Sequence, residues 1–170
     1  MRGLLIITIL CFASSANADC PCQPDSELLR TTRHFEGLRL FPYSDVAGHG
    51  TIGFGHEIKL GESYPHGITS TQAEILLESD EKVAGDNVNN LVSVPFTQGK
   101  FDGLTDFTFN LGVGTLGKST LLKRVNSGDD AGVPAAFMLY DKTHVDGELT
   151  VLSGLFSRRK AEANMYMEGE

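Results

Sequence analysis

Tryptophan is absent from this chain of 170 residues, and cysteine is scarce, with three in all. Two of them, Cys20 and Cys22, are separated by one residue, so a bond between them would close a strained ring. The chain therefore has no disulfide framework. A metal held by the pair is the alternative, but the five histidines lack zinc-ligand spacing. We predict no metal site and no cofactor, and we interpret residues 19–25 as a linker.

Positive charge is also in short supply, because 14 Lys and Arg stand against 22 Asp and Glu, for a net charge of -8. Nucleic-acid-binding domains are commonly basic, since they neutralise phosphates, so this balance argues against a nucleic-acid partner. It also argues against a basic patch that grips an anionic membrane. Hydrophobic residues make up 41% of the chain, which is enough for a core, and the length suits one domain.

Long hydrophobic runs are missing too, since the apolar stretch near the N-terminus covers only about residues 4–13. Arg2 precedes it and Ala16-Asn-Ala18 follows it, which is the pattern of a secretory signal cleaved before Asp19. We predict that residues 1–18 are a signal peptide and that the mature chain is secreted. An uncleaved anchor that is released later is the alternative.

Helical periodicity is present over most of the remaining chain. Residues 26–36 place apolar side chains on one face, with Asp25 as N-cap and Gly37 as stop. Residues 38–60, rich in glycine, aromatic and β-branched residues, predict a hairpin or three-stranded sheet with a turn over residues 45–50. Further helices are predicted over residues 70–91, 97–111, 119–126, 130–140 and 154–167. This order indicates the α+β class.

Four apolar side chains of the first helix and the predicted sheet are expected to pack onto the helical bundle. These are Leu28, Phe35, Leu40 and Phe54. Truncation of any one of them is predicted to cost about 2–5 kcal/mol of stability if the site is buried.

One stretch, Gly112-Val-Gly-Thr-Leu-Gly-Lys-Ser119, matches the phosphate-binding pattern G-x-x-x-x-G-K-[ST]. Such a loop works only between a buried strand and a helix. Too few residues follow Ser119 for the strand–helix units of a nucleotide-binding sheet. We therefore predict no nucleotide binding. We expect Gly112, Gly114 and Gly117 to end one helix and turn the chain, and Ser119 to cap the next helix.

Two carboxylates, Glu36 and Asp45, lie nine residues apart. Glu36 falls in the last turn of the first predicted helix, where the helix dipole and the apolar neighbours Phe35 and Leu38 favour a protonated carboxyl. Asp45 falls in a solvated turn, which favours the ionised form. Such a pair suits glycoside hydrolysis, in which one carboxyl protonates the leaving oxygen and the other supports the attacking water. The hydroxyl of Thr51 can hold a water, although spacing alone also permits a chance arrangement.

The segments Glu36-Gly-Leu-Arg-Leu, Tyr43-Ser-Asp45 and Gly50-Thr-Ile-Gly-Phe-Gly-His56 resemble the phage-type lysozymes, the T4-like endolysins of glycoside hydrolase family 24. The family's Glu-x8-Asp-x5-Thr triad falls here on Glu36, Asp45 and Thr51. The resemblance covers about residues 26–168 and continues through Phe107-Thr-Phe-Asn110 and the segment 154–162.

The resemblance implies a lysozyme-like catalytic domain over residues 26–170, with a small β lobe, a helical bundle lobe and a cleft between them. It also implies a muramidase that lyses bacteria by cutting the β-1,4 bond between N-acetylmuramic acid and N-acetylglucosamine in peptidoglycan, without a cofactor. Glu36 would be the general acid. Asp45 would position or activate water, or stabilise the oxocarbenium-like transition state, and Thr51 would help to hold the water.

Other residues receive expectations from the same resemblance. Phe109 and Asn110 are expected to line the saccharide cleft, with a plain core role as the alternative for Phe109. His56 is expected to brace the two lobes. Arg158 and Arg159 are expected either to face the cleft or to lie on a solvated helix face.

The resemblance leaves alternative functions and origins open. A lytic transglycosylase, or an inactive lysozyme-like protein that binds peptidoglycan, would carry many of the same features. A phage lysin and a defensive or digestive lysozyme of a cellular organism would both fit. The expected location is extracellular, or periplasmic if a bacterial host exports a phage protein, and the expected state is a monomer without stable membrane association.

Overall fold

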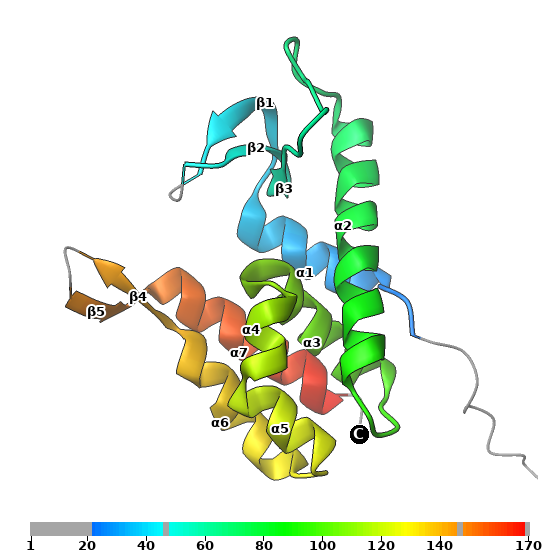
Figure 1. Ribbon diagram of the computed structural model, residues 1–170, viewed down its shortest axis with the longest axis vertical. Helices are drawn as coiled ribbons and strands as arrows, with labels where there is room; N and C mark the ends of the chain where they lie inside the picture. The colour runs from blue at the N-terminus through cyan, green and yellow to red at the C-terminus, as the bar shows by residue number, and fades with distance from the viewer. Residues whose placement is uncertain (1–21, 46–47, 146–147, 169–170) are drawn as a thin grey trace, which may run out of the picture.

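The computed structural model describes residues 22–45, 48–145 and 148–168, and these fall into two lobes (Figure 1). The smaller lobe holds an antiparallel sheet of β1 (Arg39–Ser44), β2 (Gly50–Gly53) and β3 (His56–Glu57), in that order. The larger lobe is a helical bundle, so the predicted α+β class is confirmed. The predicted signal peptide, residues 1–18, lies outside the described residues, as do residues 19–21 of the predicted linker.

Seven α-helices occur in the described part of the chain. They are α1 (Ser26–Glu36), α2 (Ser70–Leu91), α3 (Gln98–Leu111), α4 (Val113–Lys118), α5 (Thr120–Asn126), α6 (Val133–Phe137) and α7 (Ser153–Glu168). Two short 3-10 turns, η1 (Asp130–Gly132) and η2 (Met138–Tyr140), flank α6. Within the described ranges, no helix combines the length and the apolar character that crossing a bilayer requires.

Helix α1 begins and ends where its sequence predicts. The side chain of Asp25 accepts hydrogen bonds from the backbone N–H groups of Glu27 and Leu28. Gly37 ends the helix with a φ of 68°, a conformation that favours glycine. The helix therefore delivers Glu36 to the point where the bundle meets the sheet.

Helix α2 connects the two lobes, packing against β2 at one end and against α3 along its length (Figure 1). Thr69 and Gln72 form a capping box that fixes its start. Of its buried residues, Val88 belongs to the apolar cluster of the bundle, and Ala73 and Leu77 belong to that of the sheet lobe. The cluster of the sheet lobe is Ile52, Phe54, Ile68, Ala73 and Leu77.

The core of the bundle surrounds α3, which packs against α2 and α7. Phe101, Leu104 and Phe107 of this helix are fully buried. Gly103 permits the close approach of α7, because a Cβ atom at this position would lie 2.5 Å from the backbone oxygen of Glu162. The approach of α3 and α7 matters for the site, since both helices supply side chains to it.

The structure differs from the sequence-based prediction at the glycine-rich stretch 112–119. Gly112 does end α3, with a φ of 81°, and Ser119 does cap α5. Gly114 and Gly117, however, lie inside the short helix α4 and do not turn the chain. The residues before Gly112 are helical, so the buried strand that a phosphate-binding loop needs is missing there.

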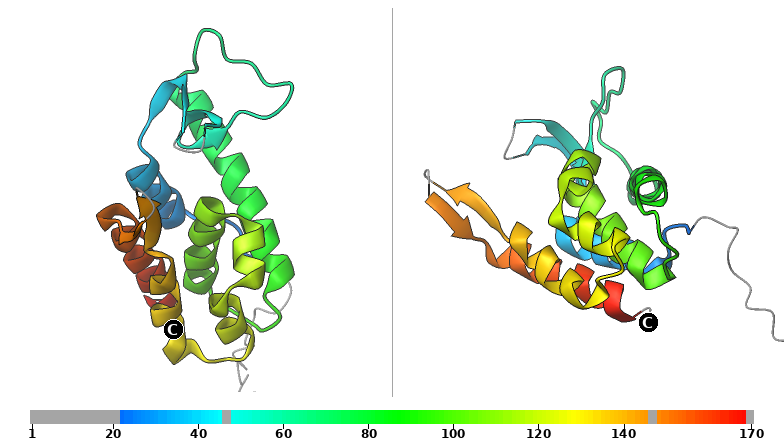
Figure 2. Two further views of the ribbon diagram at one scale, coloured as in Figure 1. Left: turned by 60° about the vertical axis from the view of Figure 1, so that its left-hand side comes forward. Right: turned by 60° about the horizontal axis from the view of Figure 1, so that its bottom comes forward.

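A second difference is a hairpin of β4 (Lys142–Val145) and β5 (Glu148–Val151), for which the sequence predicted no strands. The hairpin extends from the bundle on the same side as the three-stranded sheet (Figure 2). It leads directly into the first turn of α7. The β5–α7 junction therefore borders the space between the lobes.

The packing expectations hold for some apolar side chains and fail for one. Leu28 and Phe54 are buried, and Phe35 is partly buried. Leu40 is 37% exposed, so its predicted role as a buried contact between the lobes is wrong. It lies on β1, all of whose residues except Tyr43 are exposed.

Candidate active site

Glu36 lies in the last turn of α1, with its side chain 21% exposed. Nη1 of Arg158 donates a hydrogen bond to Oε1 of this carboxylate. The other oxygen, Oε2, lies against Gly55, where a Cβ atom would come within 2.9 Å of it and where φ is 82°. Gly55 therefore provides both the space and the backbone conformation that this carboxyl requires. Reasoning from α1 and its sequence neighbours cannot include Arg158, because it lies 122 residues further along the chain.

Arg158 is itself held in place by Asp106. Its Nε and Nη2 atoms donate to the two oxygens of the Asp106 carboxylate, each at 2.9 Å, and both residues are buried. The rings of Phe35 and Phe109 lie 5.6 and 5.8 Å from the guanidinium carbon. Burial alone would raise the pKa of Asp106, but the charge and hydrogen bonds of Arg158 outweigh burial and lower it. The bidentate pair fixes the plane of the guanidinium and thus the direction from which it meets Glu36.

Arg159, the next residue of α7, is fully buried. Its Nη2 donates to Oδ1 of Asn110 at 2.9 Å, and it forms a buried ion pair with Glu162. The alternative that Arg158 and Arg159 solvate an exposed helix face is therefore wrong. Because Oδ1 of Asn110 is held from behind, the amide N–H groups of this side chain are available for hydrogen bonding on the other side.

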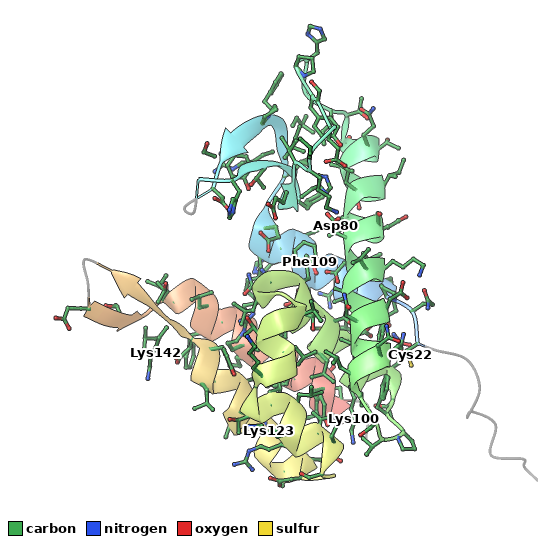
Figure 3. All side chains as sticks on the ribbon, in the orientation of Figure 1. Cys22, Asp80, Lys100, Phe109, Lys123 and Lys142 are labelled. Atoms are coloured by element: carbon green, nitrogen blue, oxygen red, sulfur yellow. The ribbon has the colours of Figure 1, made fainter. Side chains whose placement is uncertain are left out.

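Two hollows lie near the Glu36 carboxyl: Glu36 itself lines one, and its neighbour Gly55 lines the other. One, of about 460 Å³, is lined by Phe35, Glu36, Asn110, Leu152, Ser153, Gly154, Leu155 and Arg158. The other, of about 310 Å³, includes Gly55, Asp80 and Phe109 in its lining. Gly55 of the sheet lobe lines the second hollow and lies against Glu36, which lines the first. The second hollow combines residues of both lobes, and we call the two hollows together the cleft. Figure 3 labels Phe109 and Asp80, which both line the second hollow.

Asp45 and Thr51 lie on the hairpin of β1 and β2. Asp45 is 34% exposed, as expected for a solvated turn, and its Oδ1 accepts the backbone N–H of His49 at 2.8 Å. Thr51 is buried, and its hydroxyl donates to the backbone oxygen of His49 at 3.3 Å. Both side chains are thus held by hydrogen bonds to the backbone of His49.

Tyr43 shows that the predicted site residues share one region. It pairs with Thr51 across the two strands. Its pKa is raised, first by burial, then by the negative charge of Glu36, and to a smaller extent by that of Asp45. Glu36 and Asp45 therefore both lie close enough to the Tyr43 hydroxyl for their charges to act on it. No role for Tyr43 was predicted from the sequence.

His56 lies in β3 and is hydrogen bonded on both sides of its ring. Nδ1 is 2.7 Å from Asp80 of α2, and Nε2 is 2.9 Å from Glu62 of the loop that follows β3. Burial alone would lower the pKa of His56, but the hydrogen bonds and charges of the two carboxylates outweigh it and raise the pKa. The arrangement ties the sheet to α2, which is the bracing role expected from the resemblance.

Sequence reasoning missed the buried acids that surround the arginines, among them Glu81, Asp106 and Glu162. A signal for Glu81 was present, because Leu77, Glu81, Ala84 and Val88 follow helical spacing along the buried face of α2. A carboxylate at a position where periodicity demands an apolar side chain indicates a buried acid with a partner. No group of three or more side chains that could bind a metal occurs among the described residues.

A two-lobed α+β fold with a cleft between the lobes, and with a carboxylate held by arginine on its wall, defines a lysozyme-like protein. The profile of the phage lysozyme family matches residues 33–162. The chain belongs to this family. It is 38% identical over 136 residues to the endolysin of Acyrthosiphon pisum secondary endosymbiont phage 1, covering 79% of this chain and 90% of that protein.

Solved structures agree with this assignment. The muramidase domain of SpmX from Asticaccaulis excentricus superposes with a TM-score of 0.79 at 31% identity, covering 86% of this chain and 98% of the other. The endolysin of Escherichia coli O157:H7 phage FAHEc1 superposes with a TM-score of 0.77 at 35% identity, covering 87% and 95%. The lysozyme-like fold expected from the sequence is therefore confirmed.

Proposed function

We propose that this chain is a lysozyme that hydrolyses the β-1,4 bond between N-acetylmuramic acid and N-acetylglucosamine in bacterial peptidoglycan. The observation that carries the proposal is the Glu36 carboxyl, fixed by Arg158 on the cleft wall beside the hairpin of Asp45 and Thr51. Similarity to an endolysin and to a muramidase domain supports the substrate class and the reaction.

In this proposal Glu36 is the general acid. One oxygen is held by Arg158 and the other lies beside Gly55, so the carboxyl has a fixed orientation between the two hollows. It protonates the glycosidic oxygen as the bond breaks, and a fixed donor avoids the cost of reorientation in the transition state. The bond that forms joins the sugar carbon to a water oxygen.

Asp45 positions or activates that water, or stabilises the positive charge that develops on the sugar ring, and Thr51 helps to hold the water. Phe109 and Asn110 contact the saccharide. Phe109 offers an apolar surface to a sugar ring, and Asn110 offers amide donors, since its oxygen is occupied by Arg159. The wall polymer is the only partner this reaction requires, so we propose a monomer that acts without a cofactor.

The proposed location follows from the N-terminal sequence. Cleavage of residues 1–18 would release a secreted domain, whose substrate lies outside the bacterial cytoplasm. Export from a bacterial host would bring it to the periplasm, where the lysis of that host would follow. Secretion from a cellular organism would make it a defence enzyme against bacteria.

The test is to incubate residues 19–170 with purified peptidoglycan and to identify the released fragments by mass. Two variants of α1 accompany the wild type: Glu36→Gln, which removes the proposed acid, and Glu27→Gln, a matched change on the exposed first turn. Hydrolysed muramic acid ends, released by the wild type and by Glu27→Gln but not by Glu36→Gln, are the expected result. Anhydro ends would assign a lytic transglycosylase. Co-sedimentation with peptidoglycan without release would assign a binding protein.

A further inference from the structure

Glu81 is a fully buried acid in the middle of α2, and the proposed reaction does not use it directly. Its Oε1 lies 2.5 Å from the hydroxyl of Thr32 on α1, whereas its Oε2 has no hydrogen-bond partner. A buried carboxylate with one unsatisfied oxygen would be costly, so the protonation state of this group needs an explanation.

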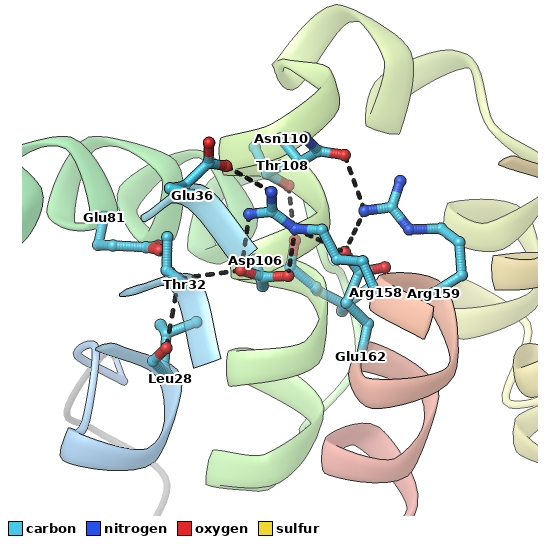
Figure 4. Close-up of polar contacts among 11 residues, drawn as sticks. Leu28, Thr32, Glu36, Glu81, Asp106, Thr108, Asn110, Arg158, Arg159 and Glu162 are labelled. Carbon is cyan, nitrogen blue, oxygen red and sulfur yellow. Dashed lines mark hydrogen bonds and ion pairs between the residues drawn. The ribbon is translucent and has the colours of Figure 1, made fainter. Parts of the chain in front are cut away.

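The contact with Thr32 connects Glu81 to the active site. The Thr32 hydroxyl also lies 2.9 Å from Oδ1 of Asp106, which holds Arg158, which in turn contacts Glu36. Figure 4 shows this series of contacts running from Glu81 on α2 through α1, α3 and α7 to Glu36. We call it the Glu81–Glu36 chain, with Thr32, Asp106 and Arg158 as its inner members.

A count of hydrogens assigns the proton. The Thr32 hydroxyl carries one hydrogen but faces three oxygens: those of Glu81 and Asp106, and the backbone oxygen of Leu28 at 3.2 Å. If Glu81 and Asp106 were both ionised, two carboxylate oxygens would compete for this one hydrogen. If Glu81 carries a proton, it donates to the Thr32 oxygen, and Thr32 then donates to Asp106. The Glu81–Thr32 contact and the Thr32–Asp106 contact then each have one donor and one acceptor.

The surroundings of Glu81 agree with this assignment. Asp102 and Asp106 face it from α3, Arg158 and Glu162 lie beyond them on α7, and Thr32 is its contact on α1. Burial raises the pKa of Glu81 to about 8, because it outweighs the opposing hydrogen bond from Thr32 and the charge of Arg158. The pKa of Asp106 is lowered, so the neighbouring acid is the ionised one.

We propose that Glu81 is a positioning residue: as a neutral carboxylic acid it donates a hydrogen bond to Thr32, turns the Thr32 hydroxyl toward Asp106, and so fixes the carboxylate that aims Arg158 at Glu36. Glu81 touches neither substrate nor the reacting atoms. Its effect is on the rate of the chemical step through the orientation of Glu36. This inference rests on the proposed lysozyme activity, because turnover is its first readout.

The test measures kcat and KM on soluble peptidoglycan fragments for the full chain and four variants. Glu81→Met keeps the side-chain shape and removes the hydrogen-bond donor, whereas Glu81→Gln keeps a donor. Thr32→Val removes the hydroxyl that links Glu81 to Asp106. The fourth variant combines Glu81→Met with Thr32→Val. We expect Glu81→Gln to keep kcat within about twofold. Glu81→Met should lower kcat about tenfold with KM unchanged, as the loss of one oriented hydrogen bond in the transition state implies. The double variant should be no slower than Thr32→Val, because both changes break the same chain.

Thermal unfolding separates positioning from a structural role. Because methionine replaces a desolvated acid, Glu81→Met should unfold at the same temperature as the wild type or a higher one while turning over more slowly. A matched control is Asp102→Leu, a buried acid of α3 that is hydrogen bonded to Gln98 and lies outside the chain of contacts. It should leave kcat unchanged.

The proton itself is accessible to carbon NMR of labelled carboxyl groups at pH 6. The Glu81 signal should have the chemical shift of a carboxylic acid, and that of Asp106 the shift of a carboxylate. An ionised Glu81, an unchanged kcat in folded Glu81→Met, or additive effects in the double variant would each overturn the proposal. An inactive wild type would instead refute the proposed lysozyme activity, while the NMR measurement would still test the assignment of the proton.

Discussion

The protein contains two cation clusters of similar composition in different surroundings. Arg158 lies between Asp106 and Glu36, and His56 lies between Asp80 and Glu62. Asp106 is fully buried, and the Arg158 cluster draws its members from three helices of the bundle. Glu62 is 32% exposed, and the His56 cluster joins the sheet lobe to one helix.

The difference lies in what each cation can do. A guanidinium keeps its charge at every ordinary pH and has a planar fork, so Arg158 holds a fixed geometry at the cleft. An imidazole gains or loses its proton near neutrality, so the His56 brace depends on pH. The Arg158 cluster orients the Glu36 carboxyl, and the His56 cluster attaches the sheet lobe to α2.

The largest effect is expected when one acid of each cluster is replaced and the two rates of hydrolysis are compared. Glu36→Gln should reduce the initial rate of peptidoglycan hydrolysis about 1000-fold, because the general acid is lost. Glu62→Gln should leave the rate within about twofold. Both variants should be compared at equal concentrations of folded protein, established by circular dichroism. Equal losses would show that the His56 cluster also takes part in the reaction.

The next effect tests the burial of the Arg158 cluster. Arg158→Met should cost about 3–5 kcal/mol of unfolding free energy, because it leaves Asp106 buried without its cation. Urea unfolding measures this quantity. Adding Asp106→Asn to Arg158→Met should recover part of the loss, since the uncompensated charge is then removed. A cost below about 1 kcal/mol would mean that water reaches the Arg158 cluster.

The His56 cluster should contribute less stability, and in a defined pH range. Its raised pKa means that the protonated ring is favoured in the folded state, so the stabilisation is fully present below the pKa of an unfolded histidine and is lost as pH rises through the folded value. The unfolding free energy of the wild type minus that of His56→Gln should be larger at pH 5.5 than at pH 9, by about 1 kcal/mol. A difference that does not change with pH would contradict the brace.

The smallest effect extends the comparison to a more exposed pair. Arg33 of α1 binds both oxygens of Glu74 on α2, at 3.0 and 2.8 Å, with both side chains about one-third exposed. Arg33→Met should cost less than about 1 kcal/mol. The cost should shrink in 1 M salt, where exposed charges are screened. A larger cost that resists salt would place this pair with the buried cluster.

Much of the fold was predictable from sequence because its signals are local. Asp25 and Gly37 mark the ends of α1, and Thr69 with Gln72 marks the start of α2. The glycine-rich, β-branched segment predicts the sheet through its composition. The helix α4 was missed because three glycines in eight residues favour a turn, a preference that packing of Leu116 into the core overrides.

The site was predictable to a smaller extent. The motif that contains Glu36, Asp45 and Thr51 is local, and it carries the resemblance to the family. The partner of Glu36 is not local, since Arg158 and Asp106 reach it from α7 and α3 only after the bundle has formed. The arginine was open to two interpretations in the sequence because a charged residue on a helix is usually solvated. Only the packing of α1, α3 and α7 removes it from water.

The buried acids also change the electrical charge of the folded molecule. The formal charge of -8 counts every Asp and Glu as ionised. Burial raises the pKa of Glu81 to about 8 and that of Asp102 to about 7, and it raises the pKa of Glu162 well above its usual range. At pH 7 the folded chain therefore keeps more protons on Glu81 and Asp102 than the unfolded chain does. Its electrophoretic mobility should therefore report a smaller negative charge than the composition gives, and its repulsion from an anionic polymer is reduced to the same degree.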